Sequence, residues 1–273
     1  MHDDAGSDFH QLEIASTLAT IERLQRDRSY RDTRGLFFIE GVRHFIEAVD
    51  HHYSVDTLLY SEKLLTNPIA RKLVRRLKRA GVPFARVTPE QFRRVSRTER
   101  ASGVAAILRQ DVRTLEQIKL ADQQCWTALS CVRSLGNFGT LLRTSAATGA
   151  AGFILLGDSI DPFDPAVVRA TMGALFKQTL VRTSAELLRR WIRSHNIQVI
   201  GASPDGAVDY KQVSYTHPAM LMLGGERKGL TEEQRSMCRH IVRIPMVEGM
   251  DSLNVAVAGS LLMYEAFRSS PGP

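Results

Sequence analysis

The stretch RSLGNFGTLLRTSAATGAAGFILLG, from Arg133 to Gly157, decides how this sequence is interpreted. Between Arg133 and Asp158 it holds a single charged side chain, Arg143, within an apolar segment punctuated by glycines. Arginine is seldom fully buried without a partner. We therefore expect Arg143 to lie on a helix and to face water, a carboxylate or a bound anion.

Strand-like and helix-like segments alternate on both sides of this stretch. Alternation of this kind predicts an α/β fold with a mostly parallel sheet that helices cover on both faces. Ligands bind beyond the carboxyl ends of the strands in such sheets. Three glycine-containing loops follow apolar strand-like runs, namely VRSLGNFG, LGGERKGL and IPMVEGMDSLN, and we expect the site to lie among them.

The first half of the chain is expected to form a smaller α/β domain of its own. Apolar residues at three-residue steps predict one helix over residues 9–30, and strands and helices alternate from there to about residue 110. The polar run 113–122 is the expected linker, so that residues 1–112 form the first domain and 123–273 the second. In the final helix Ser252 is a candidate N-cap, which would place Asn254 in the first helical turn.

The overall composition is that of an ordinary globular protein. The chain has 273 residues and a net charge of +7, with no run of 18 apolar residues that would predict a membrane span. The amino-terminal residues lack the pattern of a secretory signal, and three cysteines without a CxxC pair suggest a reducing compartment. We therefore expect a cytoplasmic protein without a bound metal.

Positive charge is concentrated in one part of the sequence. Residues 71–113 contain 13 lysines and arginines against 3 acids. Such an excess favours a polyanionic partner, because cationic side chains that contact phosphates release counterions. Nucleic acid is the first candidate, and an anionic membrane surface is the second.

Common nucleotide and hydrolase motifs do not fit the three loops. GGERKGLT lacks the lysine after the second glycine of a phosphate-binding loop, and neither GxGxxG nor GxSxG occurs. The loops instead offer main-chain groups and a few polar side chains. The residue chemistry by itself indicates a nucleotide-like ligand beside an anion-binding arginine. The candidate polar residues are Asn137, Arg143, Glu226, Ser252 and Asn254.

Three segments together resemble a known family. NFGTLLRTSAATGAAGFIL, LMLGGERKGL and IPMVEGMDSLNVAVAGSLLMYEA are similar, in order and spacing, to the three motifs of the SpoU/TrmH ribose methyltransferases of the SPOUT superfamily. The resemblance covers about residues 125–268. The earlier segment RSYRDTRGLFFIEGVRHFIEAV resembles the ribosomal-protein-like RNA-binding domain that precedes the catalytic domain in many rRNA-modifying members.

The resemblance carries expectations about fold, partners and chemistry. It implies a domain with a deep trefoil knot, a homodimer, S-adenosylmethionine as methyl donor and the 2′-hydroxyl of an RNA ribose as acceptor. The five polar residues named above match the polar positions of the three motifs and would form the catalytic site. The residues that would cradle the cofactor are Leu223, Gly224, Gly225, Ile244, Met246 and Leu253.

Two positions depart from the family pattern. Ser134-Leu135 stands where the family often has Asp-Pro, and Gly225 stands where it often has Asn. Arg143 is expected to clamp an RNA phosphate and to stabilise the developing oxyanion, because a guanidinium stays protonated in proteins. The alternative for Arg143 is a simple ion pair with Glu226.

Three functions remain open on the sequence. The first is 2′-O-methylation of ribosomal RNA, with the basic first domain selecting the site, and the second is the same chemistry on transfer RNA. The third is a ribosome-assembly factor that binds RNA without turnover.

Overall fold

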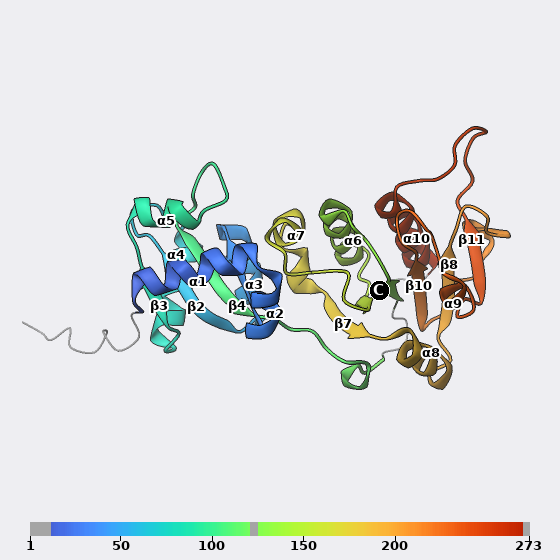
Figure 1. Ribbon diagram of the computed structural model, residues 1–273, viewed down its shortest axis with the longest axis horizontal. Coiled ribbons are helices and arrows are strands. Elements are labelled where there is room, and N and C mark those ends of the chain that lie inside the picture. The colour runs from blue at the N-terminus through green and yellow to red at the C-terminus, as the bar shows by residue number, and fades with distance from the viewer. Residues whose placement is uncertain (1–11, 121–124, 270–273) are drawn as a thin grey trace, which may run out of the picture. The chain divides into compact units, whose positions relative to one another are not determined.

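The computed structural model describes residues 12–120 and 125–269, which form two compact units (Figure 1). Unit 1 is Met1–Asp111 with Phe163–Phe176, and unit 2 is Val112–Pro162 with Lys177–Pro273. The first division falls between Asp111 and Val112, one residue before the boundary expected from the sequence. The segment 163–176, which was expected in the second domain, instead groups with unit 1.

Unit 1 is built on a mixed sheet of four strands in the order β1-β4-β2-β3. Strand β4 pairs antiparallel with β1 and β2, whereas β2 and β3 are parallel. The strands are β1 (Leu36–Glu40), β2 (Val55–Tyr60), β3 (Phe84–Arg86) and β4 (Val104–Arg109). The helices from the first part of the chain are α1 (Ile14–Arg26), α2 (Arg28–Arg34), α3 (Val42–Asp50), α4 (Pro68–Arg79) and α5 (Pro89–Val95).

The single helix expected over residues 9–30 is two helices. Asp27 is extended, with φ −117° and ψ 105°, and its carboxylate accepts a hydrogen bond from the Tyr30 backbone N–H at 3.0 Å. Aspartate is a strong N-cap residue, so it ends α1 and begins α2. Residues 9–11 of the expected helix lie outside the described part of the chain.

Two further helices of unit 1 depend on clear capping signals. Asn67 caps α4 by accepting from the Ala70 backbone N–H at 3.0 Å, as the Asn-Pro start predicts. Helix α5 was not predicted from the sequence. It begins with a reciprocal capping box between Thr88 and Gln91, which is the local signal that would have revealed it.

The segment 163–176 belongs to unit 1 because its aromatic side chains fill that unit's core. The Phe163 and Phe37 rings have centroids 4.6 Å apart, and those of Phe176 and Tyr53 are 5.0 Å apart. Phe163 is only 1% exposed. The segment contains helix α7 (Pro165–Ala170) and the start of the 3-10 helix η3 (Ala174–Lys177).

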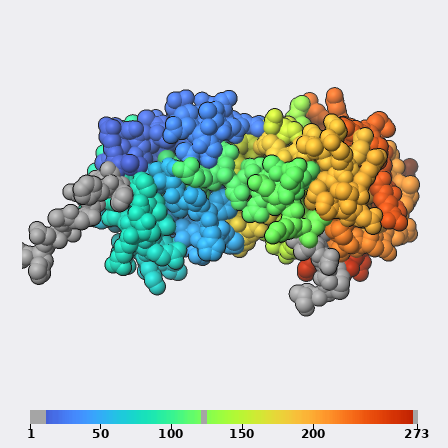
Figure 2. Space-filling model, turned by 90° about the horizontal axis from the view of Figure 1, so that it is seen from below, coloured from blue at the N-terminus to red at the C-terminus, as the bar shows by residue number. Residues whose placement is uncertain are grey.

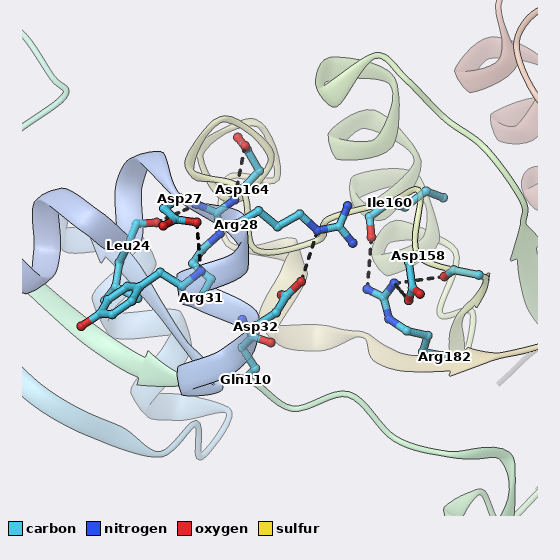
Figure 3. A network of polar contacts seen from close by, with 12 residues as sticks. Leu24, Asp27, Arg28, Arg31, Asp32, Gln110, Asp158, Ile160, Asp164 and Arg182 are labelled. Carbon is cyan, nitrogen blue, oxygen red and sulfur yellow. Dashed lines mark hydrogen bonds and ion pairs between the residues drawn. The ribbon is translucent and has the colours of Figure 1, made fainter.

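Polar contacts attach the same segment to unit 1 (Figure 3). The Arg31 guanidinium, 3% exposed, lies 3.7 Å from the Asp164 carboxylate and donates to the Leu24 carbonyl at 2.7 Å. The His44 Nε2 lies 3.2 Å from the Val168 carbonyl. A buried cation and a buried imidazole thus both find their partners in chain that comes 120 or more residues later.

Unit 2 contains the expected parallel sheet. Its seven strands lie in the order β7-β6-β5-β10-β8-β11-β9, and each described pair is parallel. The strands are β5 (Cys125–Leu129), β6 (Gly152–Leu156), β7 (Thr179–Thr183), β8 (Gln198–Ala202), β9 (Val208–Asp209), β10 (Ala219–Leu223) and β11 (His240–Arg243). The other five strands were predicted from the sequence, but β7 and β9 were not. The knot implied by the family resemblance stays a prediction.

Helices cover both faces of this sheet. Successive side chains of a strand point to opposite faces, and β10 illustrates the consequence. Met220 and Met222 belong to the core cluster that includes α8 (Ala185–Ser194), whereas Leu223 lies against Gly259 of α10 (Val255–Ser269). Helix α10 packs against α6 (Leu135–Ala147), and the short helix α9 (Glu232–Arg235) precedes β11.

The expected linker 113–122 is packed into unit 2 over the part that the structure describes. The Arg113 backbone N–H donates to the Leu180 carbonyl at 2.8 Å, and Leu115, 4% exposed, joins the core of the unit. Burial of the apolar Leu115 side chain holds this segment against unit 2, although most of the neighbouring residues in the sequence are polar. Residues 121 and 122 lie outside the described ranges. Over residues 12–120 and 125–269, helices are too short or too polar to cross a membrane.

Candidate active site

A cavity of about 520 Å³ opens at the carboxyl ends of β8, β10 and β11. Because the strands are parallel, the loops that follow them meet at one edge of the sheet. The cavity is lined by every residue expected to cradle a cofactor and by four of the five expected polar residues. The lining residues that were predicted are Asn137, Leu223, Gly224, Gly225, Glu226, Ile244, Met246, Ser252, Leu253 and Asn254.

The loop after β10 forms one wall of this cavity. The Gly225 N–H donates to the Gly229 carbonyl at 3.0 Å, and the Gly229 N–H donates back at 2.9 Å. Gly229 has a φ of +62°, in the left-handed region that favours glycine. A Cβ on Gly224 would lie 2.1 Å from the Gly229 carbonyl carbon. Glycine at both positions is therefore required for this tight loop.

The Glu226 carboxylate binds the amino-terminal end of α6. It accepts hydrogen bonds from the Asn137 side-chain amide at 2.6 Å and from the backbone N–H groups of Arg133 and Ser134, each at 3.3 Å. A negative charge is favoured there by the helix dipole. Glu226 thus joins the second motif to the first, and it has no ion pair with Arg143 in the described residues, contrary to the simple alternative for that arginine.

Asn254 joins the third motif to the first. Its side-chain N–H donates to the Asn137 Oδ1 at 3.1 Å, and its Oδ1 accepts from the Ala256 backbone N–H at 2.8 Å. Asn254 is therefore the N-cap of α10, and the expectation that Ser252 fills that role was wrong. Ser252 lies two residues before the cap and lines the cavity.

The two departures from the family pattern have simple structural consequences. Ser134 is the N-cap of α6, and its hydroxyl accepts from the Asn137 backbone N–H at 3.3 Å. An Asp-Pro pair would fill the same cap and first helical position. A Cβ on Gly225 would lie 3.4 Å from the Cys131 carbonyl oxygen, which is an ordinary van der Waals contact, so the backbone has room for a Cβ at this position.

Arg143 lies apart from the other predicted residues. It is exposed on α6 and is not among the residues that line the cavity. Within the described ranges its guanidinium has no hydrogen bond or ion pair. The next residue, Thr144, has its hydroxyl 2.9 Å from the Ser260 hydroxyl of α10. Arg143 therefore lies on the helix that flanks α10 and has its charge available for a partner.

The loop after β8 supplies lining residues that the sequence interpretation missed. Ser203 lines the cavity, and its hydroxyl donates to the Asp205 carboxylate. Arg235 of α9 donates to both carboxylate oxygens of Asp205, at 2.7 and 2.8 Å. Hydrogen bonds from Ser203 and Arg235 hold the pKa of Asp205 below its usual value. The sequence could have indicated the residues of this loop, because they follow a predicted strand and ligands bind at the carboxyl ends of parallel strands.

Two further lining residues that the sequence analysis missed add positive charge. Arg227 and Lys228 follow Glu226 in the loop after β10 and are exposed at the cavity. Among the residues that the structure describes, His, Cys, Asp and Glu do not gather in a group of three or more that could hold a metal ion. The polar groups at the cavity are main-chain groups, side-chain amides, serine hydroxyls, one carboxylate and two cations.

The fold and the site define an α/β protein with a parallel sheet and a cavity bounded by three glycine-containing loops. Residues 126–264 match the SpoU rRNA methylase family, and residues 17–106 match the MRM3-like substrate-binding domain. This chain belongs to the SpoU rRNA methylase family. The family resemblance that the three motifs indicated is thereby confirmed.

Relatives match over nearly the whole chain. The 23S rRNA (uridine(2479)-2′-O)-methyltransferase of Streptomyces viridochromogenes is 30% identical, over 90% of this chain and 88% of that protein. A crystal structure of an AdoMet-bound rRNA methyltransferase from Sinorhizobium meliloti is 31% identical, with a TM-score of 0.86 over 94% of this chain and 97% of that one. The SpoU methyltransferase AviRb from Streptomyces viridochromogenes, in complex with AdoMet, is 28% identical, with a TM-score of 0.83 over 93% and 98%.

Proposed function

We propose that this chain transfers the methyl group of S-adenosylmethionine to the 2′-hydroxyl of a ribose in RNA, with ribosomal RNA as the acceptor. The observation that carries the proposal is that residues from all three motifs line one cavity. Two of the relatives named above are described as rRNA methyltransferases, which favours ribosomal over transfer RNA. An rRNA acceptor also favours a cytoplasmic location.

The cavity suits a nucleoside-sized cofactor. Its volume of about 520 Å³ lies in the usual range for small-molecule sites. The residues that would hold the cofactor are those after β10 and β11, where glycines and non-helical backbone bring main-chain N–H and C=O groups to the cavity wall. S-adenosylmethionine supplies an electrophilic methyl group on a sulfonium centre.

The hydrogen-bonded chain Glu226–Asn137–Asn254 would fix the geometry of the site. It links the loop after β10, the start of α6 and the start of α10 through two side-chain hydrogen bonds. Holding the two reactants in a fixed geometry accounts for a large part of many enzymatic rate enhancements. We assign these three side chains the task of positioning the loops and the ribose between them.

Arg143 would bind the phosphate next to the target ribose. The guanidinium is exposed and has no partner in the described residues, as a phosphate-binding group requires before RNA arrives. Because guanidinium groups stay protonated in proteins, Arg143 stabilises the developing oxyanion rather than accepting its proton. The proton would leave through phosphate or water.

A homodimer is part of the proposal. Helix α10 exposes four large apolar side chains on one face, each between 38% and 53% exposed, and such a stripe favours association. These residues are Val257, Leu261, Tyr264 and Phe267. Arg143 lies on the neighbouring helix and outside the cavity of its own chain, so a second copy docked on α10 would give its guanidinium a route to a substrate.

The test is transfer of labelled methyl from S-adenosylmethionine to protein-free large-subunit rRNA, small-subunit rRNA, tRNA and intact ribosomal subunits. We expect an alkali-resistant ribose methyl group in one rRNA. Arg143→Ala should lower turnover by at least about a hundredfold, in line with removal of one oxyanion-stabilising donor. Arg190→Ala, at an exposed position of α8 outside the cavity, is the matched control and should keep full activity.

Other outcomes separate the alternatives. Label in tRNA alone would keep the chemistry and overturn the assigned acceptor. RNA binding without label in any pool, intact subunits included, would favour a binding factor without turnover.

A further inference from the structure

The basic region of unit 1 divides into cations that have partners and cations that do not. On α4, Arg71 donates to the Leu65 carbonyl, and Lys78 donates to the Tyr60 hydroxyl at 3.1 Å and lies 4.2 Å from the centre of the Phe84 ring. These two side chains therefore stabilise unit 1 itself. The other four cations of α4 are Lys72, Arg75, Arg76 and Arg79.

These four cations form one face of α4, which we call the α4 basic face. Their spacing of i, i+3, i+4 and i+7 places them on the same side of the helix, over about 10 Å of its length. All four are exposed, and within the described residues none has a hydrogen bond or an ion pair. Together with Leu73 they line a surface concavity of about 490 Å³. Figure 2 shows the blue-green part of the chain that contains α4 at the surface of unit 1.

A second basic cluster, on and after α5, serves as an internal comparison. Arg93 lies 3.9 Å from the Glu90 carboxylate and Arg94 lies 3.7 Å from that of Glu22. Arg97 donates to the Gln25 side chain at 2.9 Å. These arginines already have acidic or amide partners, whereas the α4 basic face has four unneutralised charges. Free positive charge at this density repels itself and is favoured only where an anion compensates it.

We infer that the α4 basic face binds the phosphate backbone of RNA at a position separate from the ribose that is methylated. The inference rests on the proposed function for the class of partner, and it assigns a second RNA contact to unit 1. Each lysine or arginine that neutralises a phosphate releases counterions, so this face would add affinity without reading base sequence.

An anionic membrane surface would use the same charges but fits the helix less well. Interfacial helices bury an apolar face in the lipid boundary. The apolar residues Ala70, Leu73 and Val74 of α4 are buried in unit 1, which leaves Ile69 as the exposed large apolar side chain of this helix. The observations therefore favour RNA.

The experiment compares three versions of the full-length chain. The first is the unsubstituted protein, and the second carries glutamine at all four positions of the α4 basic face. The third is a control that also loses four exposed cations, outside the cavity and in unit 2. The control substitutions are Arg190→Gln, Arg193→Gln, Lys211→Gln and Arg239→Gln. Circular dichroism and thermal melting establish that each version is folded.

Binding to protein-free large-subunit rRNA is measured over a range of salt concentrations, with S-adenosylmethionine binding as a separate readout. We expect the α4 variant to bind RNA at least about tenfold more weakly near 0.15 M salt. The plot of log K against log salt concentration, where K is the RNA association constant, should have a slope that is smaller in magnitude by about 3. The control should keep the slope of the unsubstituted protein, and all three should bind S-adenosylmethionine equally.

The outcomes distinguish this inference from the proposed function. RNA binding that depends on α4, without methyl transfer to any RNA, would support the inference and overturn the proposed function. Methyl transfer and RNA binding that are unchanged in the α4 variant would overturn the inference and leave the proposed function standing. Unchanged RNA binding together with loss of binding to phosphatidylserine-containing vesicles would assign the face to a membrane surface and also overturn it.

Discussion

At the residue scale, the site depends on a few side chains that each make more than one contact. Asn254 shows this most clearly, since one amide caps α10 with its oxygen and donates to Asn137 with its nitrogen. Asparagine is suited to this because its short side chain carries an acceptor and a donor on one planar group. The same residue thus ends a loop and joins two motifs.

Glu226→Gln tests whether the carboxylate positions the loops. Glutamine has one acceptor oxygen in place of two, so the Asn137 amide and the two backbone N–H groups of α6 can no longer all be satisfied. We expect kcat to fall about tenfold or more with only about 1 kcal/mol lost in unfolding free energy, because these groups are exposed. Equal turnover in Glu226→Gln and in Glu186→Gln, an exposed control on α8 outside the cavity, would contradict this role.

His44 gives unit 1 a dependence on pH. Burial is the main cause that lowers the pKa of His44 below its ordinary value of 6.5. The unfolded chain therefore takes up a proton that the folded chain resists, and stability is lost as pH falls below about 6.5. We expect the unfolding free energy to decline between pH 7 and pH 5 with a slope of at most about 1.4 kcal/mol per pH unit from this group.

The check for His44 is urea unfolding of the unsubstituted chain and of His44→Gln, which keeps a donor for the Val168 carbonyl but does not titrate. The substitution should flatten the decline, whereas His51→Gln at an exposed position should not. Parallel curves for the unsubstituted chain and His44→Gln would show that another group is responsible.

At the scale of the element, α10 has two different faces. Its buried face holds Gly259, where a Cβ would lie 2.6 Å from Leu141 and 2.7 Å from Leu223, so the helix lies very close to α6 and β10. Its exposed face carries the apolar stripe. A solvent-facing helix is normally polar on its outer side, and this departure is what indicates a partner.

The double variant Leu261→Glu, Tyr264→Glu should convert a dimer into a monomer. Two charges placed in an apolar contact cannot be desolvated without a partner. Sedimentation velocity at micromolar concentration measures the change, and circular dichroism establishes that the fold is kept. The matched control is Leu187→Glu, at a 43% exposed position of α8, which should leave the mass unchanged. A monomeric unsubstituted protein would refute the proposed dimer.

At the scale of the whole molecule, the two units are not consecutive pieces of chain. Unit 1 is completed by residues 163–176, so residues 1–111 by themselves lack part of their core. The Arg31 guanidinium would also lose the Asp164 carboxylate. The match of residues 17–106 to a substrate-binding domain therefore covers most of unit 1 but not all of it.

Phe163→Ala measures the contribution of this late segment to unit 1. Removal of a fully buried phenylalanine costs about 3–5 kcal/mol through lost burial and a residual cavity. We expect limited proteolysis to begin in unit 1. In urea unfolding, unit 1 should unfold at a lower urea concentration than in the unsubstituted protein. Leu187→Ala, at a 43% exposed position of α8 in unit 2, is the control. Equal effects of the two substitutions would mean that Phe163 is not a core residue.

The sequence by itself determined the class of fold and indicated most of the polar and glycine residues that line the cavity. The apolar alternation and the three glycine loops predicted a parallel sheet with a site at the carboxyl ends of its strands, because local periodicity and turn chemistry are properties of neighbouring residues. The same local signals predicted α4 and its Asn67 cap. The ten predicted residues that line the cavity come from three motifs whose spacing is visible without a structure.

Only the tertiary structure decided which distant groups meet. Serine and asparagine are both good N-cap residues, so the sequence permits either Ser252 or Asn254 to cap α10. Asn254 is the cap in the structure, where its side chain also donates to Asn137 of α6. Ser203 joined the cavity wall through pairing of β8 with β10. The segment 163–176 belongs to unit 1 because burial of its phenylalanine side chains is most favourable where the apolar core closely matches their shape. The location of that part of the core depends on the whole fold and not on adjacent residues.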